Sequence, residues 1–483
     1  MFRKTVILAL LVLKMVQILR ICLIKFWWCI KMIKCLKKFK FDTKINQARN
    51  VEVNIKGKKH ILFCVSENVN LDPWPEAFGY IDHPLTMVMF DENANKLWER
   101  TFGRGTVPGI WFSPFIAFDL DKDGIDEIYF VHNTDDKHPF SQFKTFMDKI
   151  DPLTGETVDS YKFPAENTLT EKMSWSFRHN LSAGYIHGEP VVVMEQGTYT
   201  NMYLQAYTTG MKKLWERKID ASDKGARASH NINVYDFNND GIDEIYYGER
   251  IISLETGKDL YCCDEDTFTG HSDIVLPFYD KDDNYYLYTC RESGNYIGCD
   301  RVVTFDKNGN SVWRALKAED EGPQQHVHTG WVATVKPDFR KIAFAVGLDA
   351  QRGYAEGHIF DAYTGEKTEF SLPAELCYCY PLDINGDGYH EFYCKGKIYD
   401  CEGNLLAELK GDYEIHTGTK ILDIPGEQAV LINKDENTVE IWGDDETKES
   451  EVFQKRHSRG FHEHMKKLTG AGYNMLPTVT SAM

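Results

Sequence analysis

Histidine and arginine recur at one place in this chain, directly before apolar segments that have strand character, such as LSAGYI, INVYDF and IVLPFY. A histidine ring exchanges protons near neutral pH, and an arginine guanidinium pairs with carboxylates. The pattern therefore predicts a polar, partly cationic site that binds an acidic ligand and moves protons. Its candidate catalytic residues are Arg178, His179, Arg227, His230, His271 and His328.

Three further segments have the acidic spacing of a calcium-binding loop: DLDKDGIDE, DFNNDGIDE and DINGDGYHE (residues 119–127, 236–244 and 383–391). Oxygen donors stand at positions 1, 3, 5 and 9, and a glycine at position 6 permits the sharp turn. The spacing predicts Ca²⁺ as a structural cofactor, although Asp-rich turns without metal have a similar composition. The candidate ligands are Asp119, Asp121, Asp123, Glu127, Asp236, Asn238, Asp240, Glu244, Asp383, Asn385, Asp387 and Glu391.

A repeat along the chain must position these residues. Each unit contains an apolar strand that ends in an acidic loop, a second apolar strand, a glycine-bearing turn, and a strand that ends in tryptophan. The units begin near Val51, Val107, Ser174, Arg227, Gly270, Val327, Leu376 and Glu414. Such a spacing of short strands is typical of propeller blades. We therefore predict an all-β fold, a single eight-bladed β-propeller over residues 46–483, with one short C-terminal helix around Phe461–Leu468.

In a propeller the innermost strands line the central channel, so the residues directly before these strands gather at one face. Trp111 and His416 stand at the same place in their units as the candidate histidines. We expect these side chains to form a pocket at the mouth of the channel. The alternative is a ring of hydrogen-bonded histidines that only closes the channel, because buried polar groups need partners.

Residues 1–45 differ from the rest, since lysines and arginines interrupt and follow a long apolar stretch. We expect a helical extension there: a membrane anchor, a signal-like segment, or a stretch upstream of a misassigned start codon. Localisation therefore stays open between membrane-associated, secreted and cytoplasmic. The 12 cysteines form no CxxC pair, which indicates reduced, mainly buried thiols and not a zinc site.

The composition restricts the class of partner. Of the 483 residues, 42% are hydrophobic, which is ample material for a large core. The formal net charge of −18 argues against nucleic acid, because phosphate binding requires a basic surface. We expect a monomer.

The stretches around the acidic loops resemble one enzyme family. FDLDKDGIDEIYF and YDFNNDGIDEIYYGERI are similar to inner strands of polysaccharide lyase family 11, the rhamnogalacturonan lyases. ARASHNINVYDFNNDG resembles that family's Arg-x-x-x-His stretch, and GHSD (Gly270–Asp273) resembles its Gly-His-Gly-Asp motif, with Ser272 in place of the second glycine. FG-GAP-type propellers share the acidic loops, so the latter two stretches carry the resemblance.

The resemblance implies a calcium-rich propeller that cleaves galacturonosyl linkages of pectic rhamnogalacturonan by β-elimination. The partner would be an acidic polysaccharide or oligosaccharide. Arg178 and Arg227, or a calcium ion, would hold the uronate carboxylate, and His230 or His271 would take the C5 proton.

Two alternatives stay open. One is a non-catalytic, calcium-stabilised propeller that binds an acidic glycan or a protein partner. In this alternative residues 1–45 would associate the protein with a membrane. The other is hydrolysis by paired carboxylates such as Glu249 and Glu292.

Overall fold

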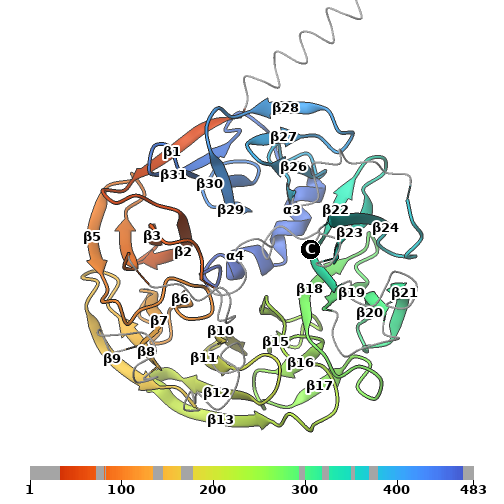
Figure 1. Cartoon of the computed structure of the whole chain (residues 1–483), viewed down its shortest axis with the longest axis horizontal. Coiled ribbons are helices and arrows are strands. Elements are labelled where there is room, and N and C mark those ends of the chain that lie inside the picture. Colours follow the sequence, from red (N-terminus) through yellow and green to blue (C-terminus); the bar gives the residue numbers. More distant parts are fainter. Residues whose placement is uncertain are drawn as a thin grey trace, which may run out of the picture.

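The strands of this chain are arranged in eight antiparallel sheets around a common axis (Figure 1). In the part of the chain that the structure describes, seven sheets have four strands and one has three. The predicted all-β, eight-bladed β-propeller is thereby confirmed. This computed structural model describes residues 33–71, 81, 83–133, 145–164, 178–292, 300–317, 326–349, 354–368, 379–470 and 483.

In the first seven blades the chain runs in order from one edge strand to the other, and neighbouring strands in the sequence pair with one another. The first four blades contain β2 (Gln47–Ile55), β3 (Lys58–Ser66), β4 (Thr86–Phe90) and β5 (Lys96–Thr101); β6 (Phe115–Phe118), β7 (Glu127–Asn133), β8 (Thr145–Ile150) and β9 (Thr157–Lys162); β10 (His179–Ile186), β11 (Glu189–Gln196), β12 (Met202–Thr208) and β13 (Lys212–Ile219); and β14 (Asn233–Tyr235), β15 (Glu244–Tyr247), β16 (Arg250–Ser253) and β17 (Asp259–Cys262). The last four contain β18 (Ser272–Tyr279), β19 (Tyr285–Arg291), β20 (Asp300–Asp306) and β21 (Ser311–Lys317); β22 (His326–Val335), β23 (Arg340–Asp349) and β24 (Tyr354–Asp361); β25 (Tyr380–Leu382), β26 (Glu391–Cys394), β27 (Lys397–Tyr399) and β28 (Leu405–Glu408); and β29 (Tyr413–Thr419), β30 (Gln428–Asn433) and β31 (Thr438–Gly443), completed by β1 (Lys34–Lys40).

The ring is closed by β1, which pairs antiparallel with β31 and so joins the two ends of the chain in one sheet. The propeller therefore begins at Lys34, ahead of the boundary expected at residue 46. The lysines of β1 resembled the basic flank of an anchor, but they lie on the outer strand of a blade, where Lys34 and Lys38 pair with Asp445 and Glu436. Residues 1–32 lie outside the described residues. Among the residues described, no helix is both long and apolar enough to cross a membrane.

Neighbouring blades are joined by the tryptophans that the repeat singled out. Each indole ring packs on a glycine of positive φ in a turn of the next blade: Trp98 on Gly155, Trp215 on Gly257 and Trp313 on Gly365. Each indole N–H donates at 2.8 Å to a carbonyl of that blade: to Pro152, Leu254 and Ala362 respectively. The turn glycines are needed because any Cβ would collide with the ring.

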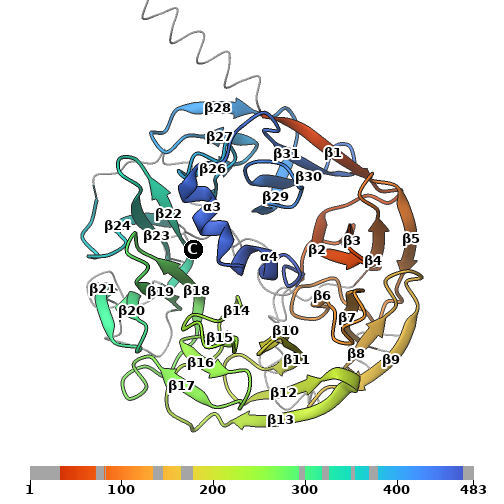
Figure 2. The same cartoon turned by 180° about the vertical axis from the view of Figure 1, so that it is seen from behind.

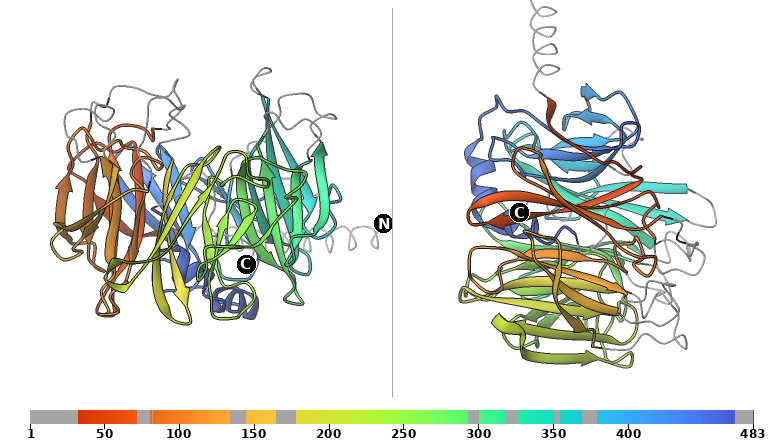
Figure 3. Two further views of the ribbon diagram at one scale, coloured as in Figure 1. Left: turned by 90° about the horizontal axis from the view of Figure 1, so that it is seen from below. Right: turned by 90° about the vertical axis from the view of Figure 1, so that its left-hand side faces the viewer.

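Two short helices, α3 (Glu451–Ser458) and α4 (Phe461–Met465), cross one end of the channel (Figures 2 and 3). The predicted terminal helix is therefore present but shorter, and α3 was not expected. Ser450 caps α3 by accepting a hydrogen bond from the Phe453 N–H. Phe461, Met465 and Leu468 belong to the buried apolar cluster between the inner strands. All eight cysteines in the described ranges are free.

Candidate functional site

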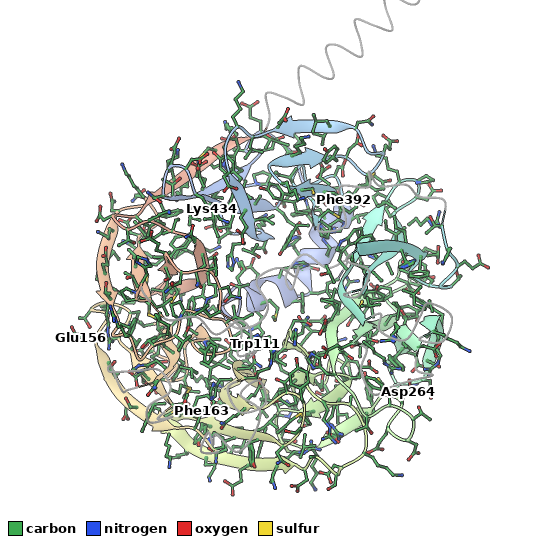
Figure 4. All side chains as sticks on the ribbon, viewed as in Figure 1. Trp111, Glu156, Phe163, Asp264, Phe392 and Lys434 are labelled. Carbon is green, nitrogen blue, oxygen red and sulfur yellow. The ribbon has the colours of Figure 1, made fainter. Side chains whose placement is uncertain are left out.

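Six side chains from blades 2 to 5 meet at one face of the ring. We call this set the mouth cluster: Trp111, Arg178, Tyr199, His230, His271 and Asp273. Figure 4 shows Trp111 on the inner side of its blade, toward the axis. Helix α4 reaches the opposite ends of the same inner strands, since the His464 ring contacts the Ala183 carbonyl at 2.8 Å. The mouth cluster and the helices therefore lie at opposite ends of the channel.

The Asp273 carboxylate lies between two imidazoles. Its Oδ1 is 3.1 Å from His271 Nε2 and 3.5 Å from His230 Nδ1. The centres of the two imidazole rings are 4.3 Å apart. All three side chains are buried, with exposed fractions of 4% for His230, 2% for His271 and 0% for Asp273. One ligand atom from each lies within 4.8 Å of the other two, so these three residues could hold a metal ion.

The surroundings of His271 restrict where its proton lies. Nδ1 is in hydrogen-bond contact with the Ala228 carbonyl oxygen, which only accepts, so Nδ1 must be the donor. In neutral His271 the lone pair of Nε2 then faces Asp273 Oδ1. Two acceptors at 3.1 Å repel each other unless a proton or a cation lies between them. A proton or a cation therefore belongs between these two atoms.

A guanidinium and two aromatic rings complete the mouth cluster. Arg178 lies over the Trp111 ring at 4.6 Å and over the Tyr199 ring at 5.1 Å. The Tyr199 hydroxyl shares a hydrogen bond of 3.2 Å with His230 Nε2, and the Trp111 ring contacts His230 edge-on. Tyr199 is partly exposed, whereas the other members are buried. Tyr199 is therefore the member best placed to meet a ligand from solvent.

A buried ion pair holds the His271–Asp273 segment in place. Arg291 donates through Nε to Glu249 Oε1 at 2.7 Å and through Nη2 to Glu249 Oε2, while Ser272 Oγ donates to Glu249 Oε1 at 2.8 Å. Glu249 is 0% and Arg291 1% exposed. Because its oxygens are engaged in these bonds, Glu249 fixes the segment and is poorly suited to the hydrolytic role considered for it with Glu292.

The remaining predicted catalytic residues lie outside this arrangement or at its edge. The Arg227 guanidinium donates to the backbone carbonyls of Asp220, Ala221 and Asp223, so it holds the connection that leads to His230. His179 lies next to the mouth cluster, with Nδ1 3.2 Å from the Trp111 carbonyl oxygen and its ring against Phe163. The backbone of His328 lies in β22, but its side chain lies outside the described residues.

His416, by contrast, has a structural place. Its Nε2 accepts a hydrogen bond from the Asn50 N–H at 3.1 Å, across the seam where the ring closes. Burial lowers the pKa of His416 to about 3. His416 therefore has the structural role considered as the alternative for these histidines, that of a buried, hydrogen-bonded side chain.

The three acidic loops share one hydrogen-bond pattern. In each, the first Asp accepts from the glycine N–H at position 6, at 3.0, 2.8 and 2.9 Å in chain order. In each, the Glu at position 9 accepts through Oε2 from the N–H at position 2, at 3.0, 3.2 and 2.9 Å. The position 6 glycines all have positive φ. The predicted turn geometry is therefore common to the loops, and their side chains decide what each can bind.

The loops differ in how well they fit a calcium ion. In loop 236–244 the donors are carboxylate and amide oxygens, and burial raises the pKa of Glu244 to about 9, which a divalent cation would reverse. In loop 383–391, Arg456 Nη2 contacts Asp383 Oδ2 at 3.0 Å, while no hydrogen bond from any described residue reaches the buried Oδ1. In loop 119–127 the ammonium of Lys149 lies between two of the predicted ligands. Loops 236–244 and 383–391 therefore fit the ion, and loop 119–127 does not.

Tyr199 was missed in the sequence. It follows β11 in the stretch MEQGTY, at the same face as the residues that precede the inner strands. The sequence did offer a signal for it: Tyr199 follows the second strand of the same blade whose first strand is preceded by Arg178. Asp273 stood in the GHSD motif but was not singled out as catalytic.

Comparison with known proteins identifies the relatives of this chain. Residues 174–344 match the model of rhamnogalacturonan lyase family 11, C-terminal domain. The resemblance to family 11 is confirmed. The matched segment contains every member of the mouth cluster except Trp111.

Two curated relatives come from Bacillus subtilis (strain 168). The rhamnogalacturonan endolyase YesW is 24% identical over 218 residues, which cover 38% of this chain and 34% of that protein. The rhamnogalacturonan exolyase YesX is 27% identical over 209 residues, which cover 37% of this chain and 33% of that protein. The matches thus span about a third of the length of each relative.

Solved structures of rhamnogalacturonan lyases share the fold over most of the chain. A rhamnogalacturonan lyase of Bacillus licheniformis has a TM-score of 0.73 at 20% identity, covering 92% of this chain and 81% of its own. The structure of rhamnogalacturonan lyase YesW also has a TM-score of 0.73, at 17% identity, covering 94% and 82%. The propeller of this chain is therefore the fold of these structures.

Proposed function

We propose that this chain is a rhamnogalacturonan lyase-like enzyme that cleaves a pectic polysaccharide or oligosaccharide by β-elimination at the mouth cluster. The observation that carries the proposal is the Asp273 carboxylate between His230 and His271, with the Arg178 guanidinium close by. The segment that matches family 11 supplies His230, His271, Asp273 and Arg178.

Elimination at a galacturonosyl residue requires a neutralised carboxylate, because the negative charge that develops at C5 spreads into it. Arg178 provides one positive charge, held in place by two aromatic rings.

Proton transfer is assigned to His230 and Tyr199. The C5–H bond breaks and its proton passes to the enzyme, a C4–C5 double bond forms, and the C4–O bond breaks as the leaving oxygen takes up a proton. His271 Nδ1 is bonded to the Ala228 carbonyl and its Nε2 faces Asp273, whereas His230 Nε2 is bonded to the hydroxyl of Tyr199, the partly exposed member through which a substrate proton can reach it. Of the two candidate bases, His230 is therefore the better placed, with Tyr199 as the contact to substrate.

A non-catalytic propeller that binds an acidic glycan is the second candidate. The low exposure of His230, His271 and Asp273 favours it, because buried side chains cannot touch a polymer without some opening of the site. Binding without product formation would identify this case.

Calcium is proposed as a structural cofactor of loops 236–244 and 383–391. These loops join inner strands to their neighbours in blades 4 and 7, so calcium would stabilise the blades without taking part in elimination.

The test is ultraviolet absorbance of the unsaturated uronide during incubation with pectic rhamnogalacturonan. The wild type should form the product, and His230→Ala/His271→Ala should lose it by at least about a hundredfold, the range typical of a lost acid–base group. His60→Ala, a buried histidine of blade 1 that does not belong to the mouth cluster, is the matched control and should retain activity. Full activity of the double variant would reject the assignment.

A further inference from the structure

The loop 119–127 has a lysine where a calcium ion would be expected. Lys149 Nζ is 2.6 Å from Asp121 Oδ2 and 2.9 Å from Glu127 Oε1. Both oxygens belong to the ligand set that the spacing predicts. Calcium ligands lie about 2.3–2.6 Å from the ion, so an ammonium in hydrogen bonds to two of them occupies nearly the same position. Ion and ammonium cannot both be there.

The other loops lack this lysine at the corresponding place. Lys149 in β8 stands opposite Tyr129, which follows Glu127 by two residues. The tyrosines at the same place in blades 4 and 7, Tyr246 and Tyr393, stand opposite Ile251 and Ile398. In those loops the second oxygen of the position 9 glutamate accepts a hydrogen bond from an asparagine side-chain amide: from Asn238 at 3.5 Å and from Asn385 at 2.8 Å. The lysine is thus particular to blade 2.

The loop that has the lysine also has one more carboxylate among its predicted ligands than the other two loops have. Loop 119–127 has Asp121 at position 3, where the other two loops have Asn238 and Asn385. Loop 119–127 therefore has one more carboxylate than loop 236–244, and Lys149 compensates for it. Counting the predicted ligands alone, Asp119, Asp121, Asp123 and Glu127 together with Lys149 have a net charge of −3 when ionised, the same as Asp236, Asp240 and Glu244.

We propose that Lys149 is the built-in cation of loop 119–127, so that this loop binds no calcium and blade 2 keeps its form without metal. Lys149 is anchored for this role, since its side chain is only 20% exposed and both of its carboxylate partners belong to the loop. Loop 236–244, with Ile251 at the same place, would depend on metal. The number of calcium ions bound per chain would then depend on whether a cation lies between two ligands of the loop, as Lys149 does, and not on a contact with one ligand such as that of Arg456 with Asp383.

The experiment is calcium titration of the full chain by isothermal titration calorimetry, with metal content measured after dialysis. Lys149→Ile gives loop 119–127 the side chain found in blade 4, and Asp121→Asn/Lys149→Ile gives it the full side-chain set of blade 4 at these positions. Both variants should bind one more Ca²⁺ per chain than the wild type. Lys149→Arg keeps a cation and should bind the wild-type number.

Thermal unfolding with and without calcium gives a second readout that does not depend on activity. The calcium-induced rise in Tm should be larger in Lys149→Ile than in the wild type, because the variant has lost its internal cation. A variant that folds only with calcium would support the proposal as well. The proposal is overturned if Lys149→Ile binds the same number of ions as the wild type, or if Asp123→Asn in the wild-type chain removes one. Neither result depends on whether the mouth cluster is catalytic.

Discussion

The ion pair between Glu249 and Arg291 supports the mouth cluster, and its removal should be costly. Glu249→Gln leaves the Arg291 charge buried with one partner fewer, and weakens the acceptor for Ser272. Breaking a buried ion pair on one side costs about 3–5 kcal/mol. Arg291 keeps a second carboxylate, Asp264, at 2.8 Å, which places the expected loss near the lower end, about 3 kcal/mol.

Chemical denaturation followed by tryptophan fluorescence would measure this loss. The double variant Glu249→Gln/Arg291→Met removes both charges and should recover part of the stability, because no unpaired charge stays buried. The matched control is Asp266→Asn, which breaks an exposed pair with Lys224 and should leave stability nearly unchanged. If Glu249→Gln is as stable as this control, the buried pair does not support the segment as described.

Three further perturbations test other parts of the structure. Gly257→Ala puts a Cβ 2.6 Å from the Trp215 ring, so its free energy of unfolding should fall by roughly 1–3 kcal/mol more than that of Gly210→Ala. Gly210 has a similar φ but open space around it, so equal losses would contradict the packing of Trp215 on Gly257. Burial raises the pKa of Glu195 to about 8, so between pH 4.5 and 8 the unfolded carboxyl releases a proton that the folded one keeps, and stability falls as pH rises. Glu195→Gln should remove this fall in stability with pH and be roughly 2–4 kcal/mol more stable than the wild type at pH 8, with little difference at pH 4.5. Parallel profiles of unfolding free energy against pH for the two proteins would contradict this. Chelation of calcium should lower the Tm of the wild type and have a smaller effect on Glu244→Gln, which lacks a ligand of loop 236–244; an equal effect would show that this loop holds no calcium.

The fold could be predicted because its unit repeats. Each blade repeats the apolar strands and several repeat the tryptophan, and the packing of Trp215 on Gly257 shows why these positions recur with fixed spacing. The ring closure could not be predicted in the same way. The lysines of β1 suggested a membrane-flanking segment, and only pairing with β31, some 400 residues away in the chain, shows them to be the outer strand of a blade.

The mouth cluster was predictable in part. The position before the inner strands led to Arg178, His230 and His271, because a propeller brings these positions to one face. Position alone could not separate these residues from Arg227, whose guanidinium turns back to carbonyls of its own connection. It also gave no reason to single out Tyr199, which comes from a different connection of its blade. Side-chain direction, which depends on local backbone geometry, decides membership of the cluster.

The same limit applies to the acidic loops. Their spacing predicted the turn, which depends on backbone N–H groups and a glycine of positive φ. It could not reveal Lys149, because this residue comes from a neighbouring strand and meets the loop only through strand pairing.

Mass spectrometry of the products formed from pectic rhamnogalacturonan tests the proposed chemistry most directly. Elimination leaves each new non-reducing end lighter by one water molecule than hydrolysis does. We expect oligosaccharides with this lighter end from the wild type, and none from His230→Ala/His271→Ala. Hydrated ends, or binding of the polymer with no shorter products, would contradict a lyase at the mouth cluster.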